Sequence, residues 1–374
     1  MGTIKRTFAN NLTSAGKINS TNLDSVVPAS NIANSSVTNV TEVSPSIGAA
    51  IKGVAGNPPS PSQTLGDMWY DTNLGTLKNV GQGTASWASG ASLPATRQNG
   101  GQAGLQTAAV FAGGQTPGTY NNNNTYLYDG SSWTSGNNLG TARRSATMMG
   151  TQTAALLASS GTNNPLTATT ATEEWDGTNW TSGGAQNTAR YGSFSGGTQT
   201  QAVIAGGSGP SVYYDDTEEY NGSSWTTATL MPGNQGNGTS GSDTQTDMYC
   251  VAGGPGNKTT SVVYDGTNWT SGASLSGDGR RGTGGAMPSS SSPGFVCAGE
   301  TATVNPVTIT EEWNGTSFSS STAIPAAHRD PGNGDGGTGE AGLVSGGHSS
   351  TAISSSVFEW TGTQQTVKTV TTST

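Results

Sequence analysis

The feature that most constrains this chain is a phrase that returns along it. The stretch "EEWDGTNWTSG" at 173–183 comes back as "EEYNGSSWTTA" at 218–228, "VVYDGTNWTSG" at 262–272 and "EEWNGTSFSSS" at 311–321. A catalytic motif normally occurs once, whereas a phrase that returns at a fixed interval is a structural unit. The sequence therefore predicts a fold built from repeats.

Two independent markers measure the period of the repeat. Small doublets follow an apolar run at Gly113-Gly114, Ser159-Ser160, Gly206-Gly207, Gly253-Gly254, Gly299-Glu300 and Gly346-Gly347, with successive offsets of 46, 47, 47, 46 and 47. Aromatic rings recur at Trp87, Trp133, Trp180, Trp225, Trp269 and Phe318, with offsets of 46, 47, 45, 44 and 49. A period of about 46 residues is typical of propeller blades.

Residues 143–184 indicate how one unit divides into four short strands. "RRSATMMG" and "TAALLASS" predict two strands, and the second is nearly all apolar, as expected for a strand covered on both faces. A polar loop leads to "TATEEWDG" and "TNWTSGG", which are joined by Asp-Gly, a strong hairpin signal. Six such units predict an all-β fold, a six-bladed β-propeller with four-stranded blades.

The rest of the chain predicts three segments. Residues 1–62 form an extended N-terminal attachment arm that ends in a Pro/Ser linker, residues 63–90 a connecting β-hairpin, and residues 91–374 the propeller. Either "ASWASG" at 85–90 or "TGTQQTVKTVTTST" at the C-terminus could supply the strand that closes the ring. The arm has too little apolar content for a core, so we expect it to order against another subunit.

Composition excludes several classes of partner. The 374-residue chain has a formal net charge of −9, which argues against nucleic acid, and no run of about 20 apolar residues could insert into a membrane. The N-terminus has no apolar h-region and predicts no secretory signal. Cys250 and Cys297 take neighbouring positions on equivalent strands and point to opposite faces, which predicts buried free thiols.

Two resemblances to known families add to this interpretation. The order apolar strand, Gly-Gly, loop, aromatic-Asp/Asn-Gly, Trp and downstream arginine resembles the Kelch repeat over residues 91–362, and implies a Kelch-like propeller. The family-like arginines are Arg97, Arg143, Arg190, Arg280 and Arg329. The fourth unit departs, since "LMPGNQGN" has no arginine, and the second unit has Ser159-Ser160 in place of the glycines.

The second resemblance lies upstream. "LGDMWYDTNLGTLK" at 65–78 resembles a segment common in tail-fibre and other structural proteins of tailed bacteriophages. "IKRTFANNLTSAGKINSTNL" at 4–23 is similar to the N-termini of virion proteins from phages of marine cyanobacteria. These resemblances imply a virion protein made in the bacterial host cytoplasm, whose arm contacts other virion proteins and which forms a homo-oligomer on the particle.

Enzyme chemistry finds little support in the residues. Galactose-oxidase-like copper enzymes need two histidines and a Cys–Tyr cross-link, but His328 and His348 are expected in loops and both cysteines in the core. A sialidase needs a converging arginine triad, whereas these arginines recur once per unit and so predict equivalent structural roles.

The paired glutamates give no catalytic pair either. Neighbours on a strand point to opposite faces, so in Glu173-Glu174, Glu218-Glu219 and Glu311-Glu312 one carboxylate is expected to be solvated and the other to meet a blade arginine. The chain also lacks phosphate-loop, zinc and EF-hand patterns. We therefore predict no enzyme, metal or cofactor.

The predicted function is a structural or adhesive virion protein of a tail fibre, baseplate or capsid surface, which displays its propeller to a host-surface protein or glycan. The second-to-third loops and the connections between blades share one face of a propeller. The expected binding residues in these loops are Tyr120, Asn122, Asn124, Asn163, Asn305 and His348. The alternatives are a protein–protein spacer or decoration protein, and a glycosidase or sialidase-like propeller enzyme.

Overall fold

The computed structural model describes residues 52–54, 68–71, 73–74, 76–334, 337–363 and 365–369. The chain divides into two compact units, one formed by 1–84 with 363–374 and the other by 85–362. Apart from residues 52–54, the predicted arm and its Pro/Ser linker lie outside the described residues. Every regular element among the described residues is a strand, as the sequence predicts.

The smaller unit contains one four-stranded sheet with the order β1-β2-β3-β29. Strand β1 (Lys52–Val54) pairs in parallel with β2 (Met68–Asp71), and β2 pairs antiparallel with β3 (Thr76–Gln82). The C-terminal strand β29 (Gln365–Thr369) pairs with the other edge of β3. The phage-like segment at 65–78 thus contains β2 and the first part of β3.

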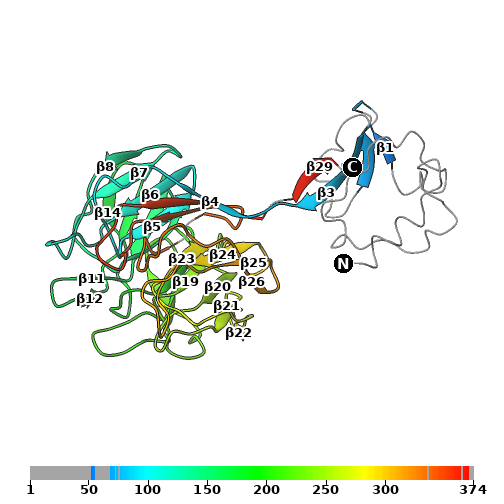
Figure 1. The fold of residues 1–374 in the computed structure, drawn as a ribbon. Helices are drawn as coiled ribbons and strands as arrows, with labels where there is room; N and C mark the ends of the chain where they lie inside the picture. The colour runs from blue at the N-terminus through cyan, green and yellow to red at the C-terminus, as the bar shows by residue number, and fades with distance from the viewer. Residues whose placement is uncertain are drawn as a thin grey trace, which may run out of the picture. The chain divides into compact units, whose positions relative to one another are not determined.

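The larger unit contains five four-stranded antiparallel sheets and one three-stranded sheet, which we call blades 1 to 6 in chain order (Figure 1). Blade 1 has β5 (Gly101–Leu105), β6 (Ala108–Ala112), β7 (Thr125–Tyr128) and β8 (Trp133–Gly136). Blade 2 has β9 (Thr147–Thr151), β10 (Ala154–Ala158), β13 (Glu173–Trp175) and β14 (Trp180–Ser182). Blade 3 has β15 (Phe194–Gly197), β16 (Ala202–Ala205), β17 (Thr217–Tyr220) and β18 (Trp225–Thr227).

The remaining blades follow the same order. Blade 4 has β19 (Thr239–Gly241), β20 (Met248–Val251), β21 (Ser261–Tyr264) and β22 (Trp269–Ser271). Blade 5 has β23 (Gly284–Ala286), β24 (Gly294–Cys297), β25 (Thr310–Trp313) and β26 (Phe318–Ser320). Blade 6 has β27 (Ala341–Ser345), β28 (Val357–Thr361) and β4 (Ser86–Ser89). A separate hairpin, β11 (Ser160–Thr162) and β12 (Thr167–Thr169), extends the loop of blade 2. The predicted all-β six-bladed propeller is confirmed.

Blade 6 is closed by the segment that precedes blade 1. Strand β4 pairs with β28 so that Trp87 stands opposite Trp360, with ring centroids 4.9 Å apart. Of the two segments that could close the ring, the structure therefore uses 85–90. Before β27, the described residues form single bridges and no further strand: Gly337 bridges Gly342 of β27, while Asn333 and Gly334 bridge Gly101 of blade 1 and Met148 of blade 2.

The predicted aromatic positions form cross-strand pairs beside each hairpin turn. The paired rings are Tyr128–Trp133, Trp175–Trp180, Tyr220–Trp225, Tyr264–Trp269 and Trp313–Phe318, with centroids 4.8–5.2 Å apart. In the turns, Asp129 Oδ1 accepts the backbone N–H groups of Ser131 and Ser132, which lowers the pKa of Asp129 to about 2. The repeated phrase is thus a turn with its packing rings.

In blades 2, 3 and 5 a buried arginine pairs with a buried glutamate of the third strand. The pairs are Arg143–Glu173 at 2.5 Å, Arg190–Glu218 at 2.6 Å and Arg280–Glu311 at 3.1 Å. Each carboxylate also accepts a backbone N–H from the connection that enters its blade, donated by Gly140, Asn187 and Ser276. The predicted pairing of one glutamate with a blade arginine is confirmed.

In blades 1, 4 and 6 the buried glutamate and the residue that donates its backbone N–H to it are both replaced, and in blades 4 and 6 the buried arginine is replaced as well. The glutamate is replaced by Tyr126, Val262 and Phe358, and the residue that donated its N–H is Pro94, Pro232 and Pro325. Proline has no N–H, so the donor is absent wherever the acceptor is absent. The arginine position holds Arg97, Gln235 and His328. Arg97 donates to the hydroxyl of Tyr126 at 3.1 Å, and the His328 ring packs edge-on against Phe358.

This alignment corrects two details of the repeat. The carbonyl of His328 accepts the N–H of Gly299 as the carbonyl of Arg143 accepts that of Gly114, so His328 and not Arg329 continues the arginine position. In blades 4 and 5 the doublet with positive φ begins at Ala252 and Ala298, one residue before the glycines marked in the sequence. Alignment of the repeats by sequence similarity alone therefore misplaced these three positions by one residue.

In two of the three glutamate pairs, and at the single Glu359 of blade 6, a glutamate joins neighbouring blades. Glu174 accepts a hydrogen bond from Tyr220, Glu219 from Tyr264 at 2.9 Å, and Glu359 from Tyr128. Where the next blade has a tryptophan at this position, blades 1 and 4 have Leu127 and Val263, whereas blade 5 keeps Glu312, which accepts a hydrogen bond from Ser321 of its own blade at 2.7 Å. The second glutamate of each pair is partly exposed, as expected, and for Glu174 and Glu219 a tyrosine hydroxyl across the blade border is an additional partner that the sequence did not predict.

The two cysteines are free and buried, as predicted. Burial raises the pKa of Cys297 to about 12 and also raises that of Cys250. Both thiols therefore stay protonated and unreactive at neutral pH.

We predict that Arg190→Ala lowers the free energy of unfolding by about 3–5 kcal/mol, because Glu218 is left buried without its cation. The triple variant Asn187→Pro, Arg190→Gln and Glu218→Val copies blade 4 and should cost much less. Denaturant unfolding of both variants measures the difference. Unchanged unfolding of Arg190→Ala would show that the pair has no structural role.

A second prediction concerns ring closure. A chain that begins at residue 91 lacks β4, so the outer edge of blade 6 loses Trp87, and we expect no cooperative thermal transition of the propeller. A chain that begins at residue 63 keeps β4 and should unfold like the full chain. Calorimetry of the two truncated chains tests this, and a cooperative transition in the shorter chain would refute it.

Candidate functional site

Two sets of loops meet on one face of the propeller, which we call the loop face. In each blade, the connection that enters the blade pairs with the loop between its second and third strands. The isolated bridges are Gln98↔Gln115, Arg144↔Gly161, Tyr191↔Ser208, Gly236↔Gly254, Arg281↔Glu300 and Arg329↔His348. These bridges give both loop sets a fixed position on a rigid scaffold.

Around the axis, the loop face rests on a closed circle of backbone hydrogen bonds. The members, one per blade, are Asn99, Ser145, Gly192, Asn237, Gly282 and Asp330, with φ between 51° and 62°. Each N–H donates to the carbonyl of the previous member, and Asn99 donates to Asp330, at 2.6–3.0 Å. Glycine, asparagine and aspartate suit this left-handed conformation, and the closed circle satisfies every donor.

Next to the members of this circle in the chain, or on the loops that bridge them, are polar side chains that we call the polar arc, and it includes the side chain of the circle member Asp330. Its members are Arg144, Tyr191, Tyr213, Arg281, Glu300, Arg329, Asp330 and His348. Arg281 Nε lies 2.6 Å from Glu300 Oε1, and Arg329 Nε lies 3.8 Å from Glu300 Oε2. Arg329 also donates to Asp330 at 2.7 Å. The members come from the entries and loops of blades 2, 3, 5 and 6.

The polar arc has a positive net charge, although the chain as a whole is acidic. Three arginines face two carboxylates, whereas the whole chain has a net charge of −9. The hydrogen bond to Glu300 raises the pKa of Arg281, while burial raises the pKa of Asp330 and Arg329 opposes that effect. The side chains of Arg281 and Arg329 are 45% and 31% exposed, so their charges reach solvent.

Tyr120 is an expected binding residue that lies openly on this face. It is 46% exposed, and the guanidinium carbon of Arg144 lies 5.0 Å from the centre of its ring. Arg144 also donates to Gln115 at 3.1 Å. Tyr120 thus provides a flat, solvent-facing ring with a cation behind it.

The other expected residues are distributed differently. Asn124 accepts a hydrogen bond from buried Arg97 at 2.8 Å, and Asn122 donates to the carbonyl of Gly114, so both amides serve the loop itself. Asn163 lies beside Asn121 of the neighbouring blade, and Asn305 is exposed in the loop of blade 5. His348 belongs to the polar arc. The structure therefore places His348 in the polar arc and Tyr120 against Arg144 of the arc.

Sequence reasoning missed two of the three arginines of the arc, and assigned the third, Arg329, to the buried arginine position. Arg144 and Arg281 each follow a buried arginine directly, in "RR" doublets at 143–144 and 280–281. The second residue of each doublet bridges a loop, and its side chain contacts loop residues, Tyr120 for Arg144 and Glu300 for Arg281, which a count of one arginine per blade did not distinguish.

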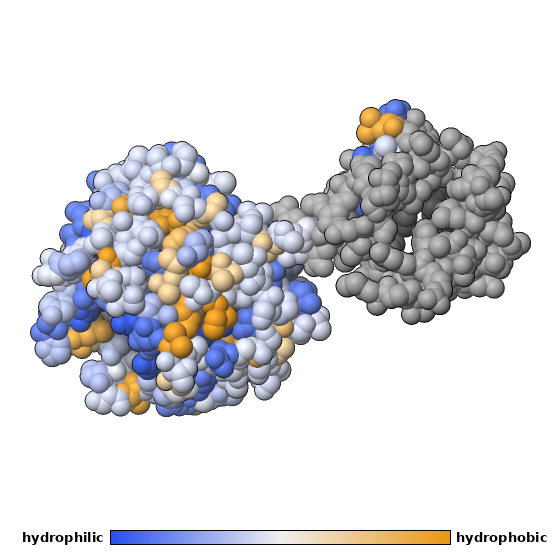
Figure 2. Space-filling model, viewed as in Figure 1, coloured by the Kyte–Doolittle hydropathy of each residue, from blue (hydrophilic) through white to orange (hydrophobic). Residues whose placement is uncertain are grey.

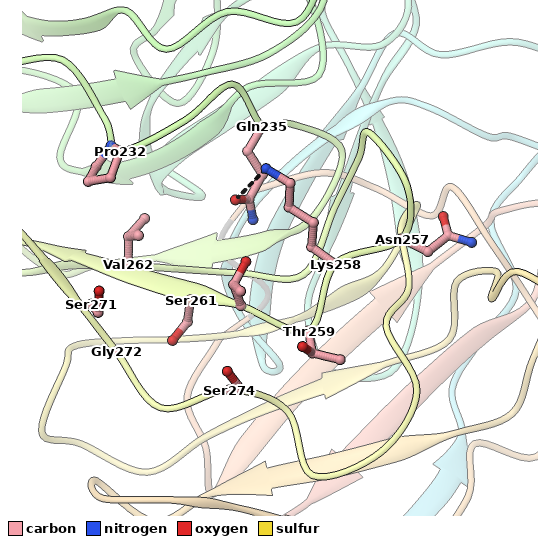
Figure 3. A pocket seen from close by; sticks show the side chains of 11 residues that line it. Pro232, Gln235, Asn257, Lys258, Thr259, Ser261, Val262, Ser271, Gly272 and Ser274 are labelled. Atoms are coloured by element: carbon pink, nitrogen blue, oxygen red, sulfur yellow. Dashed lines mark hydrogen bonds between the residues drawn. The ribbon is translucent and has the colours of Figure 1, made fainter.

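A hollow of about 710 Å³ opens in blade 4, beside the position where blades 2, 3 and 5 hold their ion pair (Figure 3). We call it the blade-4 hollow. Its lining residues are Pro232, Gln235, Asn257, Lys258, Thr259, Thr260, Ser261, Val262, Ser271, Gly272 and Ser274. Figure 3 shows Lys258 extended toward Gln235, and its Nζ lies 3.5 Å from Gln235 Oε1.

Other features of the surface bear on the class of site. Within the part of the chain that the structure describes, no cluster of three His, Cys, Asp or Glu residues could hold a metal ion. No helix among these residues has the length and apolar content needed to cross a membrane. Figure 2 shows the propeller in one view as largely neutral and hydrophilic, with apolar residues in small groups.

Comparison with known proteins supports the fold. The chain is similar to the solved structure titled "Structure of YjhT", with a TM-score of 0.57, 11% sequence identity, and coverage of 75% of this chain and 99% of that chain. No family model matches the chain. No curated protein matches it either. At this identity the likeness establishes a β-propeller, and the Kelch and phage resemblances rest on the sequence motifs.

Proposed function

We propose that this chain is a virion protein of a tailed phage that presents its propeller for attachment to the host surface. The phage-like segments at 4–23 and 65–78 support the virion assignment. The observation that carries the binding role is the polar arc, fixed on a closed circle of six backbone hydrogen bonds. A rigid platform lowers the entropy lost when a partner binds.

The chemistry of the arc favours a hydrated, polar partner such as a surface glycan. Arginines and tyrosines offer several hydrogen-bond donors together with flat faces on which a sugar ring can stack. Tyr120 and Arg144 provide such a face at one end of the arc, and Arg281 and Arg329 provide exposed cations at the other.

We favour binding over catalysis for this face. Glu300 lies between Arg281 and Arg329, and Asp330 is held by Arg329, so both carboxylates already have cationic partners. A general acid or base needs a proton site that is free to exchange with a substrate. On this proposal the arm at 1–62 holds the protein to other virion proteins, and several copies act together on the particle.

We predict that Tyr120→Ala or Arg144→Ala lowers adsorption of the isolated protein to host cells or to a glycan array by about tenfold or more, since each removes part of one stacking face. Leu105→Ala is the matched control, because Leu105 is similarly exposed, at 53%, but is the last residue of β5, at the end of the blade opposite the loop face. Equal adsorption of all three variants and the parent would refute the proposed face.

A separate prediction tests the arm. Deletion of residues 1–62 should leave a folded propeller that still adsorbs to its ligand but no longer incorporates into particles. Labelling of the protein on intact particles provides the measurement. Normal incorporation of the shortened chain would contradict the attachment role.

A further inference from the structure

The blade-4 hollow occupies a position that in three sister blades holds a carboxylate. In blades 2, 3 and 5 a glutamate side chain is bound there by an arginine and by a backbone N–H. Blade 4 has Val262 for the glutamate, Gln235 for the arginine and Pro232 for the N–H donor. All three of these residues line the hollow.

Loss of the pair does not by itself leave a hollow. Blade 1 fills the same position with Tyr126 under Arg97, and blade 6 fills it with Phe358 against His328. Blade 4 alone combines two smaller side chains, and its polar rim of serines and threonines leaves the space open to solvent. A volume of about 710 Å³ is within the usual range of small-ligand sites.

The hollow contains one cationic side chain, that of Lys258. Lys258 is the only lysine in residues 85–362 of the sequence, and it lies in the lining of the hollow. Its Nζ donates to the carbonyl of Asn234 at 2.9 Å and lies 3.5 Å from Gln235 Oε1, which takes the arginine position. No carboxylate of the described residues lies within ion-pair distance of it, and burial lowers the pKa of Lys258. A half-buried ammonium with neutral partners attracts an anion.

We propose that the blade-4 hollow binds small saccharides that carry a carboxylate, such as uronic acids. The ligand carboxylate takes the position that glutamate fills in blades 2, 3 and 5, with the Lys258 ammonium as its cation. The hydroxyls of Thr259, Ser271 and Ser274 line the rest of the hollow and suit the hydroxyl groups of a sugar ring. This inference depends on the repeat and does not rest on the virion assignment.

The test titrates the full chain with glucuronate and with glucose in a calorimeter at low ionic strength. We expect glucuronate to bind about tenfold or more tightly than glucose, and Lys258→Met to lose that preference, since a charged hydrogen bond is removed. Lys78→Met, in strand β3 outside the propeller, is the matched control and should bind like the parent. Equal binding of the two sugars, or unchanged glucuronate binding by Lys258→Met, would overturn the proposal.

A second variant approaches the same question from the opposite direction. Gln235→Arg with Val262→Glu rebuilds the ion pair of the sister blades, places a protein carboxylate in the hollow and should abolish glucuronate binding. Retained binding in this folded variant would overturn the proposal even if Lys258→Met proved unstable. Host adsorption measured on the same variants separates this site from the polar arc, because Tyr120→Ala should leave glucuronate binding unchanged.

Discussion

Each blade of this protein has two apolar faces, and only neighbouring blades can cover them. The hydrophobic clusters cross blade borders: one joins Val110 of blade 1 to Met148 and Leu157 of blade 2, and another joins Phe295 of blade 5 to Trp360 of blade 6. Burial of apolar area is the main favourable term in the free energy of folding. A blade that lacks a neighbour on one side leaves one apolar face exposed to water and loses much of this stabilisation. The ring must therefore close, and β4 closes it at Trp87.

The same borders also satisfy polar groups, which explains how a chain with 31% apolar residues forms a stable ring. Tyrosine hydroxyls donate to glutamates of the preceding blade, as Tyr264 does to Glu219. Gln152 and Gln199 each donate to two carbonyls of the preceding blade. Since a buried polar group without a partner costs about 1–3 kcal/mol, these contacts fix the register of one blade on the next.

Because the blades repeat, residues that differ from one blade to another can be separated from residues that build the scaffold. A residue type that recurs at the same place in most blades is part of the scaffold, as the buried arginines of blades 1, 2, 3 and 5 and the hairpin rings are. Residues that differ from the repeat, such as Lys258 and Gln235 in blade 4, do not form the ion pair of the sister blades. They line the blade-4 hollow instead. Residues one position beyond the scaffold, such as Arg281 beside Arg280, project onto the loop face from a fixed backbone.

The sequence by itself determined the strands, the hairpin turns and the six-fold count, because Asp-Gly turns, alternating burial and a 46-residue period are local properties of the chain. It also predicted that one glutamate of each Glu-Glu pair meets a blade arginine, as the pairs of Arg143, Arg190 and Arg280 show. Only the tertiary structure decided that His328 takes the place of Arg329, that Glu219 meets Tyr264 of the next blade, and that the second arginines gather with Glu300 in one arc. The physical reason is twofold. Contacts between blades join residues that are far apart in the sequence, and a shift of one residue in the alignment of two repeats turns a side chain to the other face of its strand although the two repeats still look alike in sequence.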